Sequence, residues 1–178
     1  MISFFQLVKK RRSIRLFKPE KIEKEKLLKI LSAGLMAPTS RNTQATEFVL
    51  VQNAEMLQKL SQSRPSGSYF IEKAAAAIVV CVDTNKSTCP VEDASIASIT
   101  MQFQAEELDL GSCWVQIHRR EKNAGVLSEN YVRELLGVAN HFDIVCIVAL
   151  GVKNEEKPLH DEQNLNFNKI HYEKILAL

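Results

Sequence analysis

The spacing of hydrophobic and polar residues predicts helices and strands that alternate along the chain. Between Pro19 and Pro38 apolar residues recur at helical spacing, and the helix must end before Pro38 because the residue preceding a proline avoids the α region. Residues 76–83 and 143–150 are apolar without alternation, as expected of strands covered on both faces. The other predicted elements are a helix from Ser3 to about Arg11, a strand at 46–52, a helix from Asn53 to about Leu60, a strand at 113–117 and a helix from Ser128 that ends at Gly137.

A long helix is predicted from Pro90 to about Leu108, with Gly111 just beyond its end. Its apolar residues form two stripes, one of Ala94, Ala97, Met101, Ala105 and Leu108 and the other of Ile96, Ile99 and Phe103. A helix that is apolar on two faces is a buried one, and part of this burial is expected to come from a partner subunit. From Lys153 onward the chain is polar and ends in an amphipathic piece at 169–178.

Composition indicates one globular domain. The chain has 178 residues, 46% hydrophobic and 25% charged, and its elements interleave without repeat or linker, which predicts a single domain over 1–178 of the α/β or α+β class. The longest apolar stretch, 74–82, is far shorter than the roughly 20 residues that cross a bilayer, so no membrane span is expected. The N-terminus is apolar before it is basic, the reverse of a secretory signal, which favours a cytoplasmic location. The four cysteines lack C-x-x-C spacing and are expected to be reduced.

A basic cluster between Lys9 and Arg15 is the first candidate for chemistry. It places five cations in seven residues although the net charge is only +2. Arginine forks match phosphate oxygens and the hydroxyl of Ser13 adds a donor, so the cluster fits a phosphate monoester. The alternative is a solvated helix end, where cations offset the negative pole of the helix dipole. Nucleic-acid binding is disfavoured, because the other charges are balanced and no aromatic residues interleave with the basic ones.

A polar loop at 37–44 is the second candidate. It offers hydroxyls, amides and one guanidinium between a helix and a strand, a position from which loops often bind ligands; the alternative is an ordinary connection rich in turn formers. The four histidines lack metal-site spacing, so no metal is expected. A nucleophilic pair of Cys113 and His118 is a weaker hypothesis, since no oxyanion loop accompanies it. Dinucleotide and P-loop fingerprints are absent from the sequence.

Several segments in this order resemble the FMN-dependent nitroreductase family, in particular its short members. The matching segments are 11–17 (RRSIRLF), 37–44 (APTSRNTQ), 47–51 (EFVLV), 110–114 (LGSCW), 135–138 (LLGV), 144–151 and 168–172 (NKIHY). The resemblance spans almost the whole chain. It implies an α+β fold, a three-layer α/β/α sandwich around a mostly antiparallel sheet, that assembles into an intertwined homodimer.

The same resemblance implies an FMN site at the subunit interface, built from both chains. The residues implied for one chain are Arg11, Arg12 and Ser13 at the phosphate and ribityl chain, Arg15 at the pyrimidine edge, and Gly151 and Lys153 closing the phosphate site. Those implied for the other chain are Pro38, Thr39, Ser40, Asn42 and Gln44 against the flavin, and the backbone of Val115, Gln116, Ile117 and His118 near N5.

The activity implied by the resemblance is an NAD(P)H-dependent reduction of nitro compounds, quinones or a related small acceptor, by a ping-pong hydride transfer through flavin N5. Arg15 would stabilise the reduced flavin, and no residue is assigned as a catalytic acid or base. The loop departs from the family where Arg41 replaces a small residue and Ala45 and Thr46 follow Gln44, so the acceptor is left open. Two other functions stay as alternatives: an anion- or nucleic-acid-binding module using the basic cluster, and a flavin-binding protein without turnover.

Overall fold

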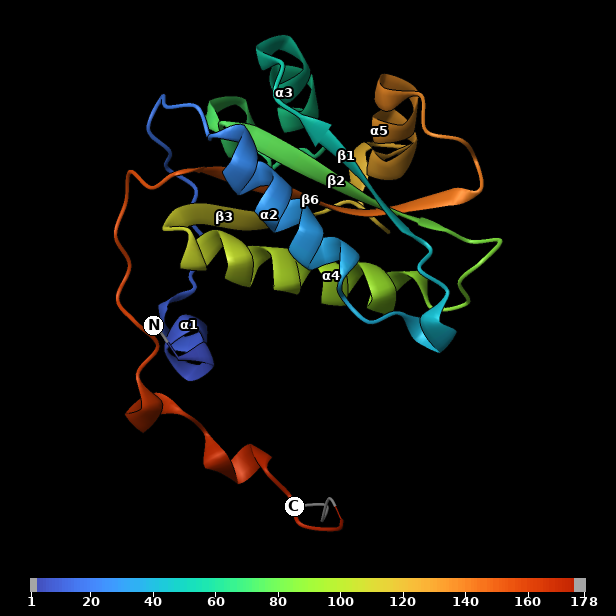
Figure 1. The fold of residues 1–178 in the computed structure, drawn as a ribbon. Helices are drawn as coiled ribbons and strands as arrows, with labels where there is room; N and C mark the ends of the chain where they lie inside the picture. The colour runs from blue at the N-terminus through green and yellow to red at the C-terminus, as the bar shows by residue number, and fades with distance from the viewer. Residues whose placement is uncertain (1–2, 175–178) are drawn as a thin grey trace.

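A four-stranded antiparallel sheet runs through the centre of the protein (Figure 1). The computed structural model describes residues 3–174. In the order in which they pair, the strands are β1 (Thr46–Val51), β2 (Ala76–Asp83), β6 (Phe142–Val152) and β3 (Leu110–Gln116). Every residue of β2 is buried, and β6 is buried from Ile144 to Gly151, which confirms the prediction of two strands covered on both faces.

Helices cover both faces of the sheet and produce three layers (Figure 1). One face carries α2 (Lys24–Leu35) and α4 (Pro90–Glu107), and the other carries α3 (Ala54–Ser61) and α5 (Ser128–Leu136). Successive residues of β2 point to opposite faces, so Ile78 and Val80 pack in the α2 and α4 layer while Val79 and Cys81 pack in the other. The α+β class expected from the sequence is confirmed.

The N-terminal part of the chain crosses one end of the sheet. After α1 (Phe4–Lys10), residues 11–17, called the basic segment below, run extended and bridge to β3 at Ser112 and to Lys153 just after β6. Gly111 and Gly151 lie opposite each other in the pairing of β3 with β6. A Cβ atom at Gly111 would lie 2.7 Å from the Ile14 side chain, and one at Gly151 would lie 2.5 Å from the Phe17 ring. The two glycines therefore let the basic segment approach the sheet closely.

The two apolar stripes of α4 differ in burial. Ala94, Ala97, Met101 and Ala105 of the first stripe are fully buried against the sheet and α2, with Leu108 half-buried. Ile96 and Ile99 of the second stripe are each more than a third exposed, and the Phe103 ring meets Phe4 of α1 at a centroid distance of 5.2 Å. The second stripe thus lies on the outer surface of this chain, on the side of α1.

Several predicted boundaries differ from the structure. β3 begins at Leu110 rather than Cys113, and Leu127 rather than Ser128 is the cap residue of α5. A hairpin of β4 (Glu121–Asn123) and β5 (Val126–Leu127) was not predicted, because its strands are short, exposed and rich in charge. Four short 3-10 turns complete the fold: η1 (Ser40–Asn42), η2 (Tyr69–Lys73), η3 (Glu162–Asn164) and η4 (Phe167–Lys169). Of the amphipathic piece predicted at 169–178, the part to Lys174 forms no α-helix, and 175–178 lie outside the described residues.

Candidate functional site

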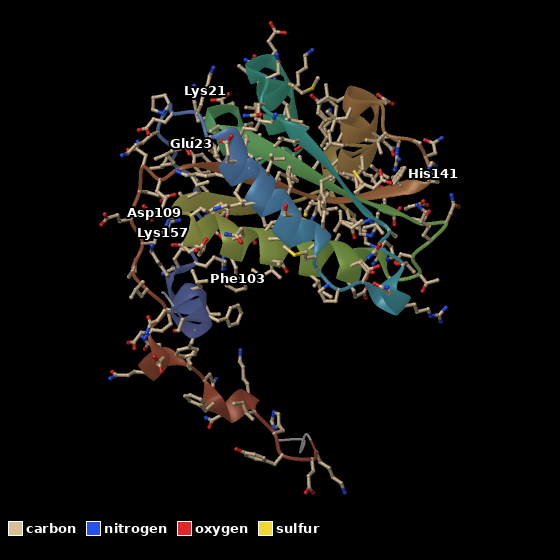
Figure 2. The ribbon with its side chains drawn as sticks, viewed as in Figure 1. Lys21, Glu23, Phe103, Asp109, His141 and Lys157 are labelled. Atoms are coloured by element: carbon tan, nitrogen blue, oxygen red, sulfur yellow. The ribbon has the colours of Figure 1, made fainter. Side chains whose placement is uncertain are left out.

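The predicted site residues fall into two groups at opposite ends of the sheet. The strand pairing places the basic segment, Gly151 and Lys153 at the end where β3 begins and β6 finishes. Residues 115–118 lie at the other end, where β3 finishes and β6 begins. The polar loop leads into β1 at this same end, because Thr46, the first residue of β1, pairs with Val82 near the end of β2. Figure 2 shows the separation, with Asp109 and Lys157 at the first end and His141 at the second. At about 1.5 Å per residue, the stretch of α4 between Asp93 and Glu106 spans about 20 Å.

The basic segment is held to the sheet by backbone hydrogen bonds. The Ile14 N–H donates to the Ser112 carbonyl at 3.0 Å, and the Lys18 N–H donates to the Val152 carbonyl at 2.9 Å. Ile14 and Phe17 are buried, whereas Arg15 between them is exposed. Burial raises the pKa of the Cys113 thiol, and the Arg15 guanidinium and Ser13 hydroxyl nearby oppose that shift. Ser13 and Arg15 are therefore brought to one side of the segment.

Arg11 and Arg12, predicted to act together, face different cavities. Arg11 lines an apolar cavity of about 340 Å³ with Phe5, Phe103 and His160. Arg12 lines a charged cavity of about 240 Å³ on the other side, and its guanidinium donates to the Pro158 carbonyl. The alternation of an extended backbone separates the two guanidinium groups, so within one chain they do not form a single cluster.

Lys153 and the C-terminal end of α4 form an ion network. Lys153 Nζ donates to the buried Glu106 carboxylate at 2.8 Å, and Lys10 Nζ lies 3.4 Å from it and 3.3 Å from Asp109. Partial burial opposes ionisation of both Lys10 and Asp109, but their mutual hydrogen bond and the neighbouring charges outweigh it. The pKa of Lys10 is raised and the pKa of Asp109 is lowered. The ammonium group of Lys153, predicted near the phosphate, is engaged with carboxylates in this chain.

The strap, residues 153–158, lies over the basic segment. One carboxylate oxygen of Glu155 accepts the backbone N–H groups of Arg15 at 2.5 Å and Leu16 at 3.0 Å, and Lys157 Nζ donates to the Ser13 carbonyl at 2.6 Å. Desolvation works against the Glu155 charge, but these backbone hydrogen bonds and Lys157 lower the pKa of Glu155. The strap therefore fixes the backbone of the basic segment and leaves the Arg15 side chain free to turn outward. The Arg15 guanidinium lies 5.8 Å from the centroid of the Phe70 ring.

The polar loop, residues 37–44, has an unusual backbone. Arg41, Asn42 and Gln44 adopt left-handed φ angles of 52°, 54° and 48°. The Gln44 N–H donates to the Thr39 hydroxyl at 3.0 Å, which closes the loop on itself. The side chains of Pro38, Arg41, Asn42 and Gln44 are exposed, and those of Thr39 and Ser40 are half-buried. The loop thus presents polar groups outward from a fixed turn.

Residues 115–118 present mainly backbone and amide groups. Val115 and Ile117 are buried in the core, while Gln116 and His118 are half-buried. The Trp114 indole donates to Gln116 Oε1 at 3.0 Å, and Gln116 Nε2 donates to the His118 carbonyl at 3.0 Å, so these side chains brace the end of β3. His118 Nδ1 faces Glu129 Oε2 at 3.6 Å rather than the Cys113 thiol, whose pKa is raised by burial. A nucleophilic Cys113–His118 pair is not formed.

Sequence reasoning missed three residues that shape these groups. Glu155 and Phe70 contact the basic segment, and the buried Asp93 accepts the Ser40 N–H at 2.7 Å. Asp93 follows Pro90 in the first turn of a predicted helix, which is a recognisable position for an acid. Its partner is 53 residues earlier in the chain, and only the folded structure brings the two together.

Comparisons with known proteins agree on one family. Residues 8–64 and 62–152 match the model of a family described as the Nitroreductase family. A provisionally named NADH dehydrogenase/NAD(P)H nitroreductase of Archaeoglobus fulgidus is 34% identical over 174 residues, which cover 95% of this chain and 97% of the relative. An FMN-dependent nitroreductase structure from Clostridium difficile R20291 is 40% identical with a TM-score of 0.95, covering 97% of this chain and 100% of that chain. An FMN reductase [NAD(P)H] of Bacillus subtilis is 33% identical over 82 residues, which are 46% of this chain and 32% of the relative.

Proposed function

The chain belongs to the Nitroreductase family, and on this premise we propose that it is an FMN-dependent oxidoreductase that uses NAD(P)H to reduce a small acceptor. The named relatives support both parts of the proposal, since one is an FMN-dependent nitroreductase and another is an FMN reductase acting with NAD(P)H. Nitro compounds and quinones are the acceptor classes we propose. The location in the cytoplasm and the single domain over 1–178 stay predictions.

The observation that carries the proposal is that the basic segment and the polar loop lie at opposite ends of the sheet, separated by the length of α4. A ligand of mononucleotide size cannot touch the basic segment and the polar loop of one chain when about 20 Å of helix lies between them. A second copy related by a two-fold axis would bring the basic segment of one chain beside the polar loop of the other. The second stripe of α4, with Ile96 and Ile99 exposed, offers the apolar surface that such a dimer would bury. We therefore propose a homodimer with two shared sites.

The donor groups present suit FMN. Ser13 and Arg15 lie on one side of a segment whose backbone is fixed by the strap, and Arg11 is half-buried at the start of the same segment. Guanidinium and hydroxyl donors match phosphate oxygens, and an outward-turned Arg15 can reach the pyrimidine edge. The polar loop supplies hydroxyl and amide groups for the ring system. Gly151 serves by its lack of a side chain, because Phe17 packs directly over it.

The chain's own residues would bind and orient rather than move protons. FMN, when bound, supplies two-electron transfer between NAD(P)H and the acceptor. Arg15 would hold a positive charge beside the bound flavin and stabilise its reduced form, and the side chains of the polar loop would hold donor and acceptor in turn at one position. Such alternation at one position produces ping-pong kinetics.

The test is the visible spectrum of the purified protein before and after anaerobic addition of NADH or NADPH. We expect a yellow protein whose flavin absorbance is bleached by at least one of the two nicotinamides and returns when a quinone is added. A colourless protein that cannot be loaded with FMN would favour the anion-binding module. A yellow protein that neither nicotinamide bleaches would favour a flavin-binding protein without turnover.

A further inference from the structure

Asp93 is a buried carboxylate without a charged partner. It is 1% exposed and lies in the first turn of α4. Among residues 3–174 no lysine, arginine or histidine forms an ion pair with it. A buried carboxylate is retained only where donors replace water, so the groups that donate to Asp93 indicate its purpose.

The donors come from two loops that are distant in sequence. The Ser40 backbone N–H, in the polar loop, donates to Asp93 Oδ1 at 2.7 Å. The Ser87 hydroxyl, in the connection between β2 and α4, donates to Oδ2 at 2.6 Å, and this hydroxyl accepts the Cys89 N–H at 3.0 Å. In Figure 1, η1 lies beside the N-terminal end of α4, where these contacts occur. One carboxylate thus joins the polar loop to the rigid helix.

The polar loop depends on this contact for its position. The hydrogen bonds Asn42 N–H to Thr39 carbonyl, Thr43 N–H to Ser40 carbonyl and Gln44 N–H to Thr39 hydroxyl all stay inside the loop. Within the described chain, the bond from Ser40 to Asp93 is the one that ties residues 38–44 to another element. A turn with three left-handed non-glycine residues is costly and persists only where its surroundings impose it.

We propose that Asp93 is a positioning residue that fixes the polar loop for cofactor and acceptor. Through Ser40 it sets the place of Asn42 and Gln44, the loop residues that carry outward amides. This role rests on the proposed function, because it assumes that the loop faces FMN and the acceptor. A purely structural role is the competing explanation, since an acid in the first helical turn also offsets the helix dipole.

Three variants separate the two explanations. Asp93→Ala removes both hydrogen bonds. Asp93→Asn keeps an oxygen for the Ser40 N–H and can donate its amide to the Ser87 hydroxyl, so it tests rescue. Ser87→Ala is the matched control, because it removes a donor from the same carboxylate and leaves the bond to the polar loop intact. Asp93→Ser is held in reserve if Asp93→Ala does not fold, since its short side chain keeps a polar group in the first turn but cannot reach Ser40.

The experiment measures amide exchange in the cofactor-free protein and then FMN binding and kinetics in the reconstituted enzyme. In Asp93→Ala the hydrogen bond from the Ser40 N–H to a carboxylate is lost, so we expect the Ser40 amide to exchange about tenfold faster or more. We expect the FMN Kd, or the KM for the electron acceptor, to rise by about tenfold as well. Asp93→Asn should stay within about threefold of the wild type in each measure. Ser87→Ala should lower the melting temperature without changing Ser40 exchange or FMN Kd.

Two outcomes overturn the proposal and are distinguishable from each other. Unchanged Ser40 exchange in Asp93→Ala, or faster exchange with unchanged FMN Kd and acceptor KM, leaves Asp93 a structural residue only. A wild-type protein that binds no FMN overturns the proposed function, and the positioning role with it, whatever the exchange at Ser40 shows.

Discussion

The two ends of α4 hold their neighbouring segments by different physical means. At the C-terminal end, Glu106 and Asp109 meet Lys10 and Lys153 in a network whose members share partners. At the N-terminal end, one carboxylate, Asp93, accepts neutral donors from two loops. Asp109 is 81% exposed in its side chain, whereas Asp93 is 1% exposed. The first arrangement has several ion pairs around the buried Glu106 and one exposed member, Asp109, whereas the second rests on one buried carboxylate with neutral donors.

The basic segment and the polar loop are therefore held in place by different interactions. An exposed ion pair contributes little and is screened by salt, so the network tolerates the loss of Asp109, whereas the buried Glu106 depends on its lysine partners. The basic segment there is fixed mainly by close packing over Gly111 and Gly151 and by the strap. At the other end, residues 38–44 of the polar loop make one hydrogen bond to another element, from Ser40 to the buried carboxylate of Asp93. Variants at the two ends should therefore fail for different reasons.

The largest expected effect is at the close packing of the C-terminal end. Gly151→Ala places a Cβ atom 2.5 Å from the buried Phe17 ring, so Phe17 or the strand must move. We expect the free energy of unfolding to fall by about 3 kcal/mol, the upper range for overpacking. Urea unfolding followed by Trp114 fluorescence measures it. Gly125→Ala is the control, because no atom lies within 4 Å there and only its φ of +79° costs about 1 kcal/mol. Equal losses in the two variants would contradict the packing argument.

The next effect concerns the arginines that the extended backbone separates. Arg11→Ala should raise the FMN Kd about tenfold, or about 1.4 kcal/mol, by removing a charged donor. Arg12→Ala should raise it less than about threefold, because its guanidinium is directed to the Pro158 carbonyl in a different cavity. Fluorescence titration of the two apoproteins compares them. A larger loss in Arg12→Ala would mean that assembly turns the other side of the segment toward the cofactor.

A smaller effect tests the exposed member of this network, Asp109, through pH. The pKa of Asp109 is lowered from 3.8 in the folded protein, so its contribution is present above that value and disappears as pH falls through the lowered pKa. Asp109→Asn should cost at most about 1 kcal/mol at pH 7, because the side chain is largely solvated. Asparagine also tolerates the left-handed φ of 59° at this position.

Denaturant unfolding of the wild type and Asp109→Asn across pH provides the measurement. The difference between them should vanish in acid below the lowered pKa and shrink in 1 M salt, where the Debye length is about 3 Å. The raised pKa of Lys10 limits the network at the alkaline side: the contribution of Lys10 to stability is present below pH 10.5 and is lost as pH rises through the raised pKa. A difference that persists in acid and in salt would assign Asp109 a role outside the network.

The smallest effect is at the polar loop. Arg41 has a φ of 52°, which glycine adopts without steric cost. Arg41→Gly should therefore raise the free energy of unfolding by about 0.5 kcal/mol, after the greater freedom of glycine in the unfolded chain is subtracted. Asn42→Gly should gain less, because asparagine already tolerates this region. Thermal unfolding of both variants measures the contrast. A loss of stability in Arg41→Gly would show that the Arg41 side chain makes a stabilising contact.

The fold was largely predictable, and the site only in part. The buried strands and the long helix are encoded by local patterns of apolar residues, so β2, β6 and α4 were found close to their true positions. The β4–β5 hairpin was missed, because exposed strands carry no hydrophobic alternation. The chemical character of the basic segment follows from its residue types. The separation of Arg11 from Arg12 depends on how the extended backbone is laid on β3, which residue types do not encode.

The hydrogen-bond partners that fix both site segments were beyond sequence reasoning for the same reason. Glu155 and Asp93 are ordinary acids in the sequence, and each gains its role from a backbone N–H that lies far away along the chain. Such contacts depend on where loops cross after the sheet has formed. Residue pattern predicts which elements form, but the meeting points of loops are set by tertiary geometry.

The pair Gly111 and Gly151 also constrains the order in which the protein folds. The basic segment is synthesised before β3 and β6, but its docking surface is completed only when these two strands pair. During synthesis Ile14 and Phe17 therefore remain without the surface that buries them, and their docking is a late, long-range step of the kind that slows folding. We expect amide protection in residues 14–18 to develop after protection in β2 and β6, so that a segment made before these strands becomes native after them.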